Sequence, residues 1–151
     1  MKKVILIPFT VVLLSCTSSK ITTGTTTNSA SEINNPALKY EILTESAYQG
    51  KEEKSFEVID SDASLSKIYE SINSEAVPEI NFAKERVVAL FLGGRNSGGY
   101  SVKIKSIEER EGKVYVSVEE IGPKPGEQVM MSLTNPFLIV KINTTKQIIV
   151  L

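Results

Sequence analysis

One short stretch gathers side chains that are able to bind or activate a ligand. It reads Gly93-Gly94-Arg95-Asn96-Ser97-Gly98-Gly99, and it places a guanidinium, an amide and a hydroxyl among four glycines. Glycine permits positive φ and close backbone approach, and successive backbone N–H groups in such turns form concave anion-binding nests. A nest beside Arg95 would hold a carboxylate or a phosphate. The stretch lacks a nucleotide-binding pattern, because no Gly-Lys-Ser/Thr follows and a strand, not a helix, comes next.

Two predicted strands position this loop. Val87 to Leu92 is an unbroken apolar run, which predicts a strand buried on both faces. Tyr100 to Lys105 alternates apolar and polar residues, which predicts one solvent-exposed face. Two interpretations of the loop stay open. It is either a hairpin connection whose glycines only permit the turn, or a partner-binding loop, since loops on a rigid scaffold often carry recognition. The candidate binding residues are Arg95, Asn96, Ser97, Gly98, Gly99 and Tyr100.

Missing residue types exclude every catalytic mechanism that needs an imidazole base. The chain has no His and one Cys, so it contains no Ser-His-Asp or Cys-His arrangement, no intramolecular disulfide and no zinc site built from His and Cys. Glu108-Glu109 and Glu119-Glu120 are adjacent acidic pairs, and neighbours on a strand point to opposite faces. We interpret them as solvated charges, while a carboxylate dyad formed across two strands stays open. We expect no catalysis, no metal and no cofactor.

The N-terminus carries a second kind of chemistry. A basic Met1-Lys2-Lys3 precedes an apolar run from Val4 to Leu14, which is shorter than the roughly 20 residues that cross a bilayer and has the proportions of a secretory signal. The sequence Leu13-Leu14-Ser15-Cys16 then resembles the lipobox of bacterial lipoproteins. The resemblance implies that residues 1–15 are a cleaved signal peptide and that Cys16 carries a diacylglyceryl thioether. Several acyl chains would anchor the protein stably to a membrane.

A polar segment follows the lipidation site. Ten of the fifteen residues from Thr17 to Ser31 are Ser or Thr, so residues 16–37 bury too little apolar surface to fold and form a tether. A flexible chain of roughly 20 residues reaches about 25 Å. We expect the tether to hold the domain off the extracytoplasmic side of a bacterial membrane, either in the periplasm or on the cell surface.

The remaining residues, 38–151, predict one soluble domain. The chain has 41% hydrophobic residues and a net charge of -1, which gives no electrostatic footprint for nucleic acid. Apolar residues at 65, 68, 69 and 72 mark one face of a helix that Ser61 or Asp62 would cap. Strands are predicted at 38–44, 55–59, 87–92, 100–105, 113–121, 128–132, 137–142 and 147–151. Short turns between them, such as 143–146, favour an antiparallel β-sandwich or partly open barrel with one short helix.

Three motifs of this domain resemble one known family. Val88 to Val102, with its Gly-Gly-Tyr end, Pro123-Lys124-Pro125-Gly126 and Thr134-Asn135-Pro136-Phe137 are similar to the PrcB C-terminal domain family, and the resemblance covers roughly Glu85 to Leu151. Members more often carry Pro at the position of Asn96. The family takes its name from a lipoprotein subunit of a cell-surface protease complex. The resemblance therefore implies an accessory, protein-binding role without catalysis.

The combined prediction is a membrane-anchored, non-catalytic lipoprotein that binds a protein, with a secreted protease as the implied partner. The alternative is a small-ligand-binding lipoprotein, in which Arg95 and the loop amides hold an anion or a glycan.

Overall fold

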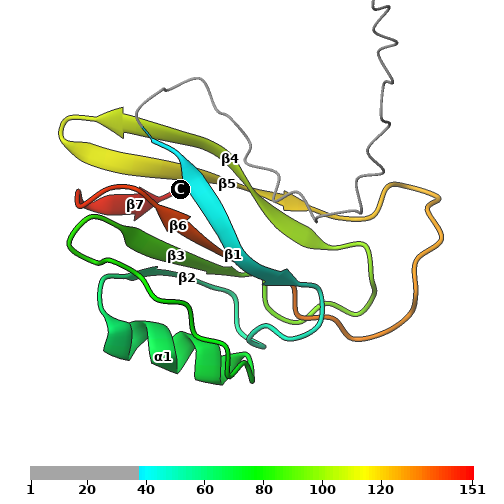
Figure 1. Cartoon of the computed structure of the whole chain (residues 1–151). Coiled ribbons are helices and arrows are strands. Elements are labelled where there is room, and N and C mark those ends of the chain that lie inside the picture. Colours follow the sequence, from blue (N-terminus) through cyan, green and yellow to red (C-terminus); the bar gives the residue numbers. More distant parts are fainter. Residues whose placement is uncertain (1–37) are drawn as a thin grey trace, which may run out of the picture.

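The computed structural model describes residues 38–151, which form two β-sheets and one helix (Figure 1). The predicted signal peptide, the lipidation site Cys16 and the tether lie outside the described residues. The elements are β1 (Tyr40–Ser46), β2 (Ser55–Ile59), α1 (Asp62–Ser71), β3 (Arg86–Phe91), β4 (Ser101–Arg110), β5 (Lys113–Ile121), β6 (Phe137–Ile142) and β7 (Ile148–Val150). Within residues 38–151 no helix has the length and apolar character needed to cross a membrane.

The strands divide into a four-stranded sheet and a three-stranded sheet. The larger has the order β1-β6-β3-β2 and is antiparallel throughout. The smaller has the order β4-β5-β7, in which β4 pairs antiparallel with β5 and β7 pairs parallel with β5. The two sheets do not close into a barrel. The predicted mainly β, sandwich-like fold class is confirmed.

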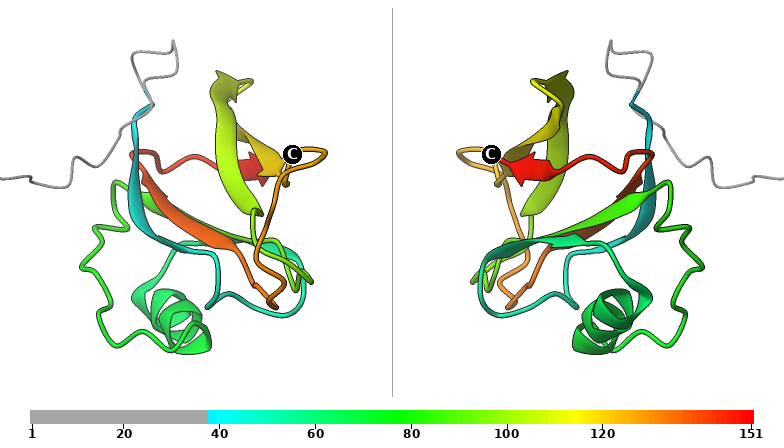
Figure 2. Two further views of the ribbon diagram at one scale, coloured as in Figure 1. Left: turned by 90° about the vertical axis from the view of Figure 1, so that its right-hand side faces the viewer. Right: turned by 90° about the vertical axis from the view of Figure 1, so that its left-hand side faces the viewer.

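The larger sheet is the middle layer of three. Val88 and Leu90 of β3 pack in a hydrophobic cluster with the smaller sheet. Ala89 and Phe91, which point to the opposite face, pack with α1. Figure 2 shows α1 on one side of the larger sheet and the smaller sheet on the other. Because β3 is covered on both faces, it is apolar without alternation, as its sequence predicted.

The helix packs by the face that its sequence predicted. Leu65, Ile68 and Tyr69 are buried, and burial raises the pKa of the Tyr69 hydroxyl. Ser61 is the N-cap by its extended backbone, but its side chain makes no cap bond. Its hydroxyl donates instead to the Ser64 hydroxyl at 3.0 Å.

The last two strands depart from the predicted antiparallel arrangement. Residues 143–146 are not a hairpin turn, because they carry the chain from β6 in the larger sheet to β7 in the smaller one. The physical reason is that β6 already pairs with β1 and β3, so it has no free edge for a following strand. The predicted strand at 128–132 is also wrong, because this segment lies in a loop.

Candidate functional site

The glycine loop, residues 92–100, connects the two sheets. It leaves β3 in the larger sheet and enters β4 in the smaller one, so the hairpin interpretation is wrong. Strand β3 has β6 and β2 as its neighbours, and β4 pairs with β5 instead. The loop therefore spans one end of the sandwich, where the β1–β2 loop and the β5–β6 loop also lie (Figure 1).

Gly93 holds this loop against the β1–β2 loop. Its φ is +78°, and a Cβ at this position would lie 2.9 Å from both Glu52 O and Lys54 N. The next residue, Gly94, donates its N–H to Glu52 O at 2.9 Å. The position thus requires glycine for two separate reasons, a left-handed backbone and a close approach of two main chains.

The other side of the glycine loop is bonded to the β5–β6 loop, residues 122–136. Arg95 N–H donates to Thr134 O at 2.7 Å, and Thr134 N–H donates to Arg95 O at 2.9 Å. The Thr134 hydroxyl, which is 1% exposed, donates to Ser97 O at 2.8 Å. Gly98 N–H donates to Met130 O at 2.8 Å. These bonds occupy backbone donors that an anion nest would need.

Arg95 shares a carboxylate with a second cation. Its Nη2 lies 3.2 Å from Glu120 Oε2, and its guanidinium carbon lies 5.5 Å from the centre of the Tyr100 ring. The ammonium group of Lys54 bonds to the other oxygen of Glu120. The hydrogen bond from Lys54 is the main cause that holds the pKa of Glu120 below its usual value; the charges of Lys54 and Arg95 add to it, while partial desolvation opposes it. Arg95 is thus already paired with a carboxylate of its own chain.

The remaining predicted loop residues have different surroundings. Asn96 is exposed, and the Ser97 hydroxyl donates to Gly98 O at 3.3 Å. Gly99 has a φ of +86°, and a Cβ there would lie 3.1 Å from a methyl carbon of Val129. The edge of the Tyr100 ring packs over Gly122, where an added Cβ would lie 3.2 Å from the nearest ring carbon. The second half of the glycine loop therefore rests on the β5–β6 loop.

The β5–β6 loop also carries a group of exposed apolar side chains that the sequence analysis missed. Met130, Met131 and Leu133 are 71%, 83% and 76% exposed. With Tyr48 of the β1–β2 loop, they make up four of the seven large apolar side chains exposed within residues 38–151. The sequence held no signal of their exposure, because a short apolar run between two chain-breaking segments, here 122–126 and 135–136, is equally typical of a buried strand.

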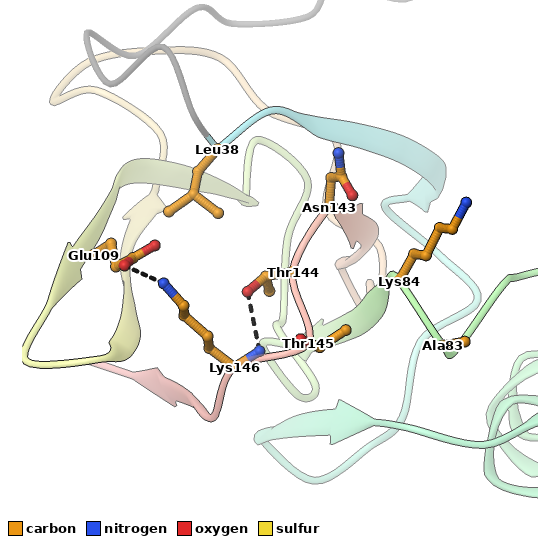
Figure 3. A pocket seen from close by; sticks show the side chains of 8 residues that line it. All are labelled: Leu38, Ala83, Lys84, Glu109, Asn143, Thr144, Thr145 and Lys146. Atoms are coloured by element: carbon orange, nitrogen blue, oxygen red, sulfur yellow. Dashed lines mark hydrogen bonds and ion pairs between the residues drawn. The ribbon is translucent and has the colours of Figure 1, made fainter.

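A shallow hollow of about 380 Å³ lies at the opposite end of the sandwich (Figure 3). Its lining comprises Leu38, Ala83, Lys84, Glu109, Asn143, Thr144, Thr145 and Lys146. The ammonium group of Lys146 bonds to Glu109, and the Lys146 N–H donates to the Thr144 hydroxyl at 3.1 Å. The lining has a single carboxylate, so the predicted acidic pairs form no dyad here. Within residues 38–151 no three His, Cys, Asp or Glu side chains cluster as metal ligands.

Comparison with known proteins adds a family relationship. Residues 86–143 match the family described as PrcB C-terminal. The matched segment begins with β3, ends just after β6, and contains both the glycine loop and the β5–β6 loop. The resemblance drawn from the sequence motifs is thereby confirmed. Neither the curated proteins nor the solved structures that were searched contained a match to the chain.

Proposed function

We propose that the chain is a lipid-anchored, non-catalytic accessory subunit that binds a secreted protease, because residues 86–143 match the PrcB C-terminal family. One observation carries the proposal. Three loops meet at one end of the sandwich, are held together by backbone hydrogen bonds, and expose apolar side chains to solvent. An exposed apolar group on a rigid support is typical of a protein-binding surface.

The direction of the chain supports this arrangement. Leu38, the first described residue, lies beside the shallow hollow, and Lys39 O accepts a hydrogen bond from Asn143. The three loops lie at the other end of the same strands (Figure 1). A tether formed by residues 16–37 would therefore join the domain at the end that holds the hollow, and the three loops would lie at the opposite end.

The absence of catalysis remains part of the proposal. Three of the four acidic residues that sequence analysis weighed as catalytic are engaged in ion pairs. Glu108 pairs with Arg110, Glu109 with Lys146, and Glu120 with Lys54 and Arg95. The lowered pKa of Glu120 makes that carboxyl a poor general acid at neutral pH. Small-anion binding at the glycine loop has less support than protein binding, because the Arg95 guanidinium already faces Glu120.

Co-isolation from native membranes tests the function. The full chain, tagged after a flexible linker at its C-terminus, would be extracted with mild detergent from the bacterium that makes it. We expect a protease subunit in near-stoichiometric amount, recognised by peptide mass fingerprint and by proteolytic activity in the eluate. An unrelated tagged lipoprotein from the same membranes serves as the control. Recovery of the chain without any protease, from membranes in which the protease is detected, would contradict the proposal.

The lipid anchor has its own test. Cys16→Ser removes the thiol that would carry the diacylglycerol. We expect the wild-type protein in the membrane fraction with a mass that corresponds to cleavage before Cys16 plus acyl chains, and the variant in the soluble fraction or retained as an uncleaved precursor. Membrane association of a processed variant equal to that of the wild type would show that Cys16 is not the anchor.

A further inference from the structure

We propose that Met130, Met131 and Leu133, here called the β5–β6 tip, insert into an apolar groove on the folded protease subunit. The inference rests on the proposed function, and it names the residues of the chain that make the contact and the kind of surface that receives them. The glycine loop then serves as the support of the tip and not as the main contact.

The tip is held in place on both sides. Gly98 N–H and Ser132 N–H both donate to Met130 O, at 2.8 and 3.0 Å. One residue after Leu133, Thr134 pairs with Arg95 through two backbone bonds and with Ser97 through its hydroxyl. The main chain of the tip is thus ordered before any partner arrives, which reduces the entropy lost on binding. Its three side chains remain exposed to solvent.

The charges around the tip favour an apolar receptor. Lys54, Arg95 and Glu120 neutralise one another in part within one ion-pair group. Further along the loop, Lys124 and Glu127 carry opposite charges, and the backbone N–H of Lys124 donates to the Glu127 carboxylate at 2.8 Å. The surroundings therefore offer no single-sign field that would select a strongly charged partner. An apolar centre with a polar, partly paired rim is the usual composition of a specific protein interface.

The side-chain types favour a protein over a lipid surface. Methionine is flexible and polarisable, and it is over-represented where proteins bind other proteins. Segments that lie in a membrane interface combine apolar residues with Trp or Phe and with Lys or Arg. Between residues 128 and 134 the chain has no aromatic and no basic residue. Val58 of β2 and Val77 of the connector after α1 are also exposed, belong to other elements than this loop, and offer matched controls.

Site-specific cross-linking tests the contact in cells. A photoreactive phenylalanine analogue replaces Met131 in the full chain, and the control places it at Val77, which is also exposed. We expect an adduct between position 131 and the protease subunit, with the cross-linked peptide mapping to an apolar surface, and no such adduct from position 77. Adducts with lipid alone, with a second copy of the chain, or in equal yield from position 77 would overturn the inference.

An affinity measurement separates this inference from the proposed function. The triple variant Met130→Ser, Met131→Ser, Leu133→Ser is compared with the control Val58→Ser, Val77→Ser, all as full chains in detergent, against the purified protease subunit. Because central apolar anchors dominate interface energies, we expect affinity to fall at least about tenfold for the triple variant and to stay within about twofold for the control.

Each outcome has one meaning. If the wild-type chain does not bind the protease, the proposed function fails. If it binds and the triple variant binds equally, only the inference about the tip fails. Circular dichroism verifies that the triple variant is folded. Should it not fold, Met131→Ser alone replaces it, since that side chain is 83% exposed and contributes little to the core. Unchanged affinity in that single variant, together with no adduct at position 131, would then reject the inference.

Discussion

Substitution of Gly93 by Ala tests whether the glycine loop lies in close backbone contact with the β1–β2 loop. Gly93 has a φ of +78°, and an added Cβ would lie 2.9 Å from two backbone atoms of residues 52 and 54. Gly126 is the matched control, because its φ is +82° and nothing lies within 4 Å of an added Cβ. Both substitutions meet the same backbone strain, so their difference isolates the steric contact.

The expected magnitudes follow from these two environments. A positive φ costs an L-residue about 1–2 kcal/mol, and the loss of glycine flexibility in the unfolded chain returns about 0.4–1 kcal/mol. Gly126→Ala should therefore lower the free energy of unfolding by about 0–1.6 kcal/mol. Gly93→Ala must also push the two loops apart, which adds about 1–3 kcal/mol for overpacking and about 0.5–1.5 kcal/mol for the Gly94 to Glu52 hydrogen bond.

Thermal unfolding of the domain, followed by circular dichroism, measures the difference. An unfolding entropy of about 2.1 cal/mol/K per residue makes each kcal/mol worth about 4 °C for a domain of this size. We expect the melting temperature of Gly93→Ala to lie about 6–18 °C below that of Gly126→Ala. Equal melting temperatures for the two variants would show that the β1–β2 loop does not lie against Gly93.

Three further predictions concern the hydrophobic core and the end of the sandwich at which the three loops meet. Thr134→Val removes a buried hydroxyl donor, so it should cost about 1–2 kcal/mol and speed amide exchange at Gly98; unchanged exchange would argue against the coupling of the two loops. For Glu120, the folded pKa lies below the unfolded one, so its contribution is complete above the unfolded pKa and is lost as pH falls through the folded pKa. Glu120→Gln should therefore cost no more than about 1 kcal/mol at pH 7 and low salt, and urea titrations should show this difference vanish below the folded pKa; a difference that persists at low pH would refute the ion-pair explanation. Leu90→Ala, in the fully buried centre of β3, should cost about 2–5 kcal/mol in the same urea titrations, and a loss below about 1 kcal/mol would contradict the position of β3 between two layers.

The sequence pattern predicted strands best where one face of the strand is buried or where both faces are buried. The boundaries 55–59, 113–121 and 137–142 agree with the strands, because alternation or an unbroken apolar run marks which faces are covered. The apolar alternation of β4 also breaks after Ser106, and the strand has a register shift between Ile104 and Ser106. Such patterns identify the face of a strand. They do not identify its neighbour, which is why the parallel pairing of β7 with β5 was missed.

The candidate site was predicted only in part for a similar reason. The glycine loop was recognised from its composition, and the structure places it among two other loops. The partner of Arg95 was beyond reach, because Glu120 lies 25 residues away and Lys54 lies 66 residues from Glu120. The β5–β6 tip was mistaken for a strand, since a short apolar run has the same composition whether it is buried or exposed. The lipidation of Cys16 stays a prediction, because that residue lies outside the described part of the chain.

Hydrogen–deuterium exchange on the full chain, with and without the purified protease subunit, tests the central claim most directly. The account predicts slower exchange in residues 128–134 on binding and unchanged exchange in residues 143–147, at the opposite end of the sandwich. Protection confined to residues 143–147, or binding without any protection of residues 128–134, would contradict it.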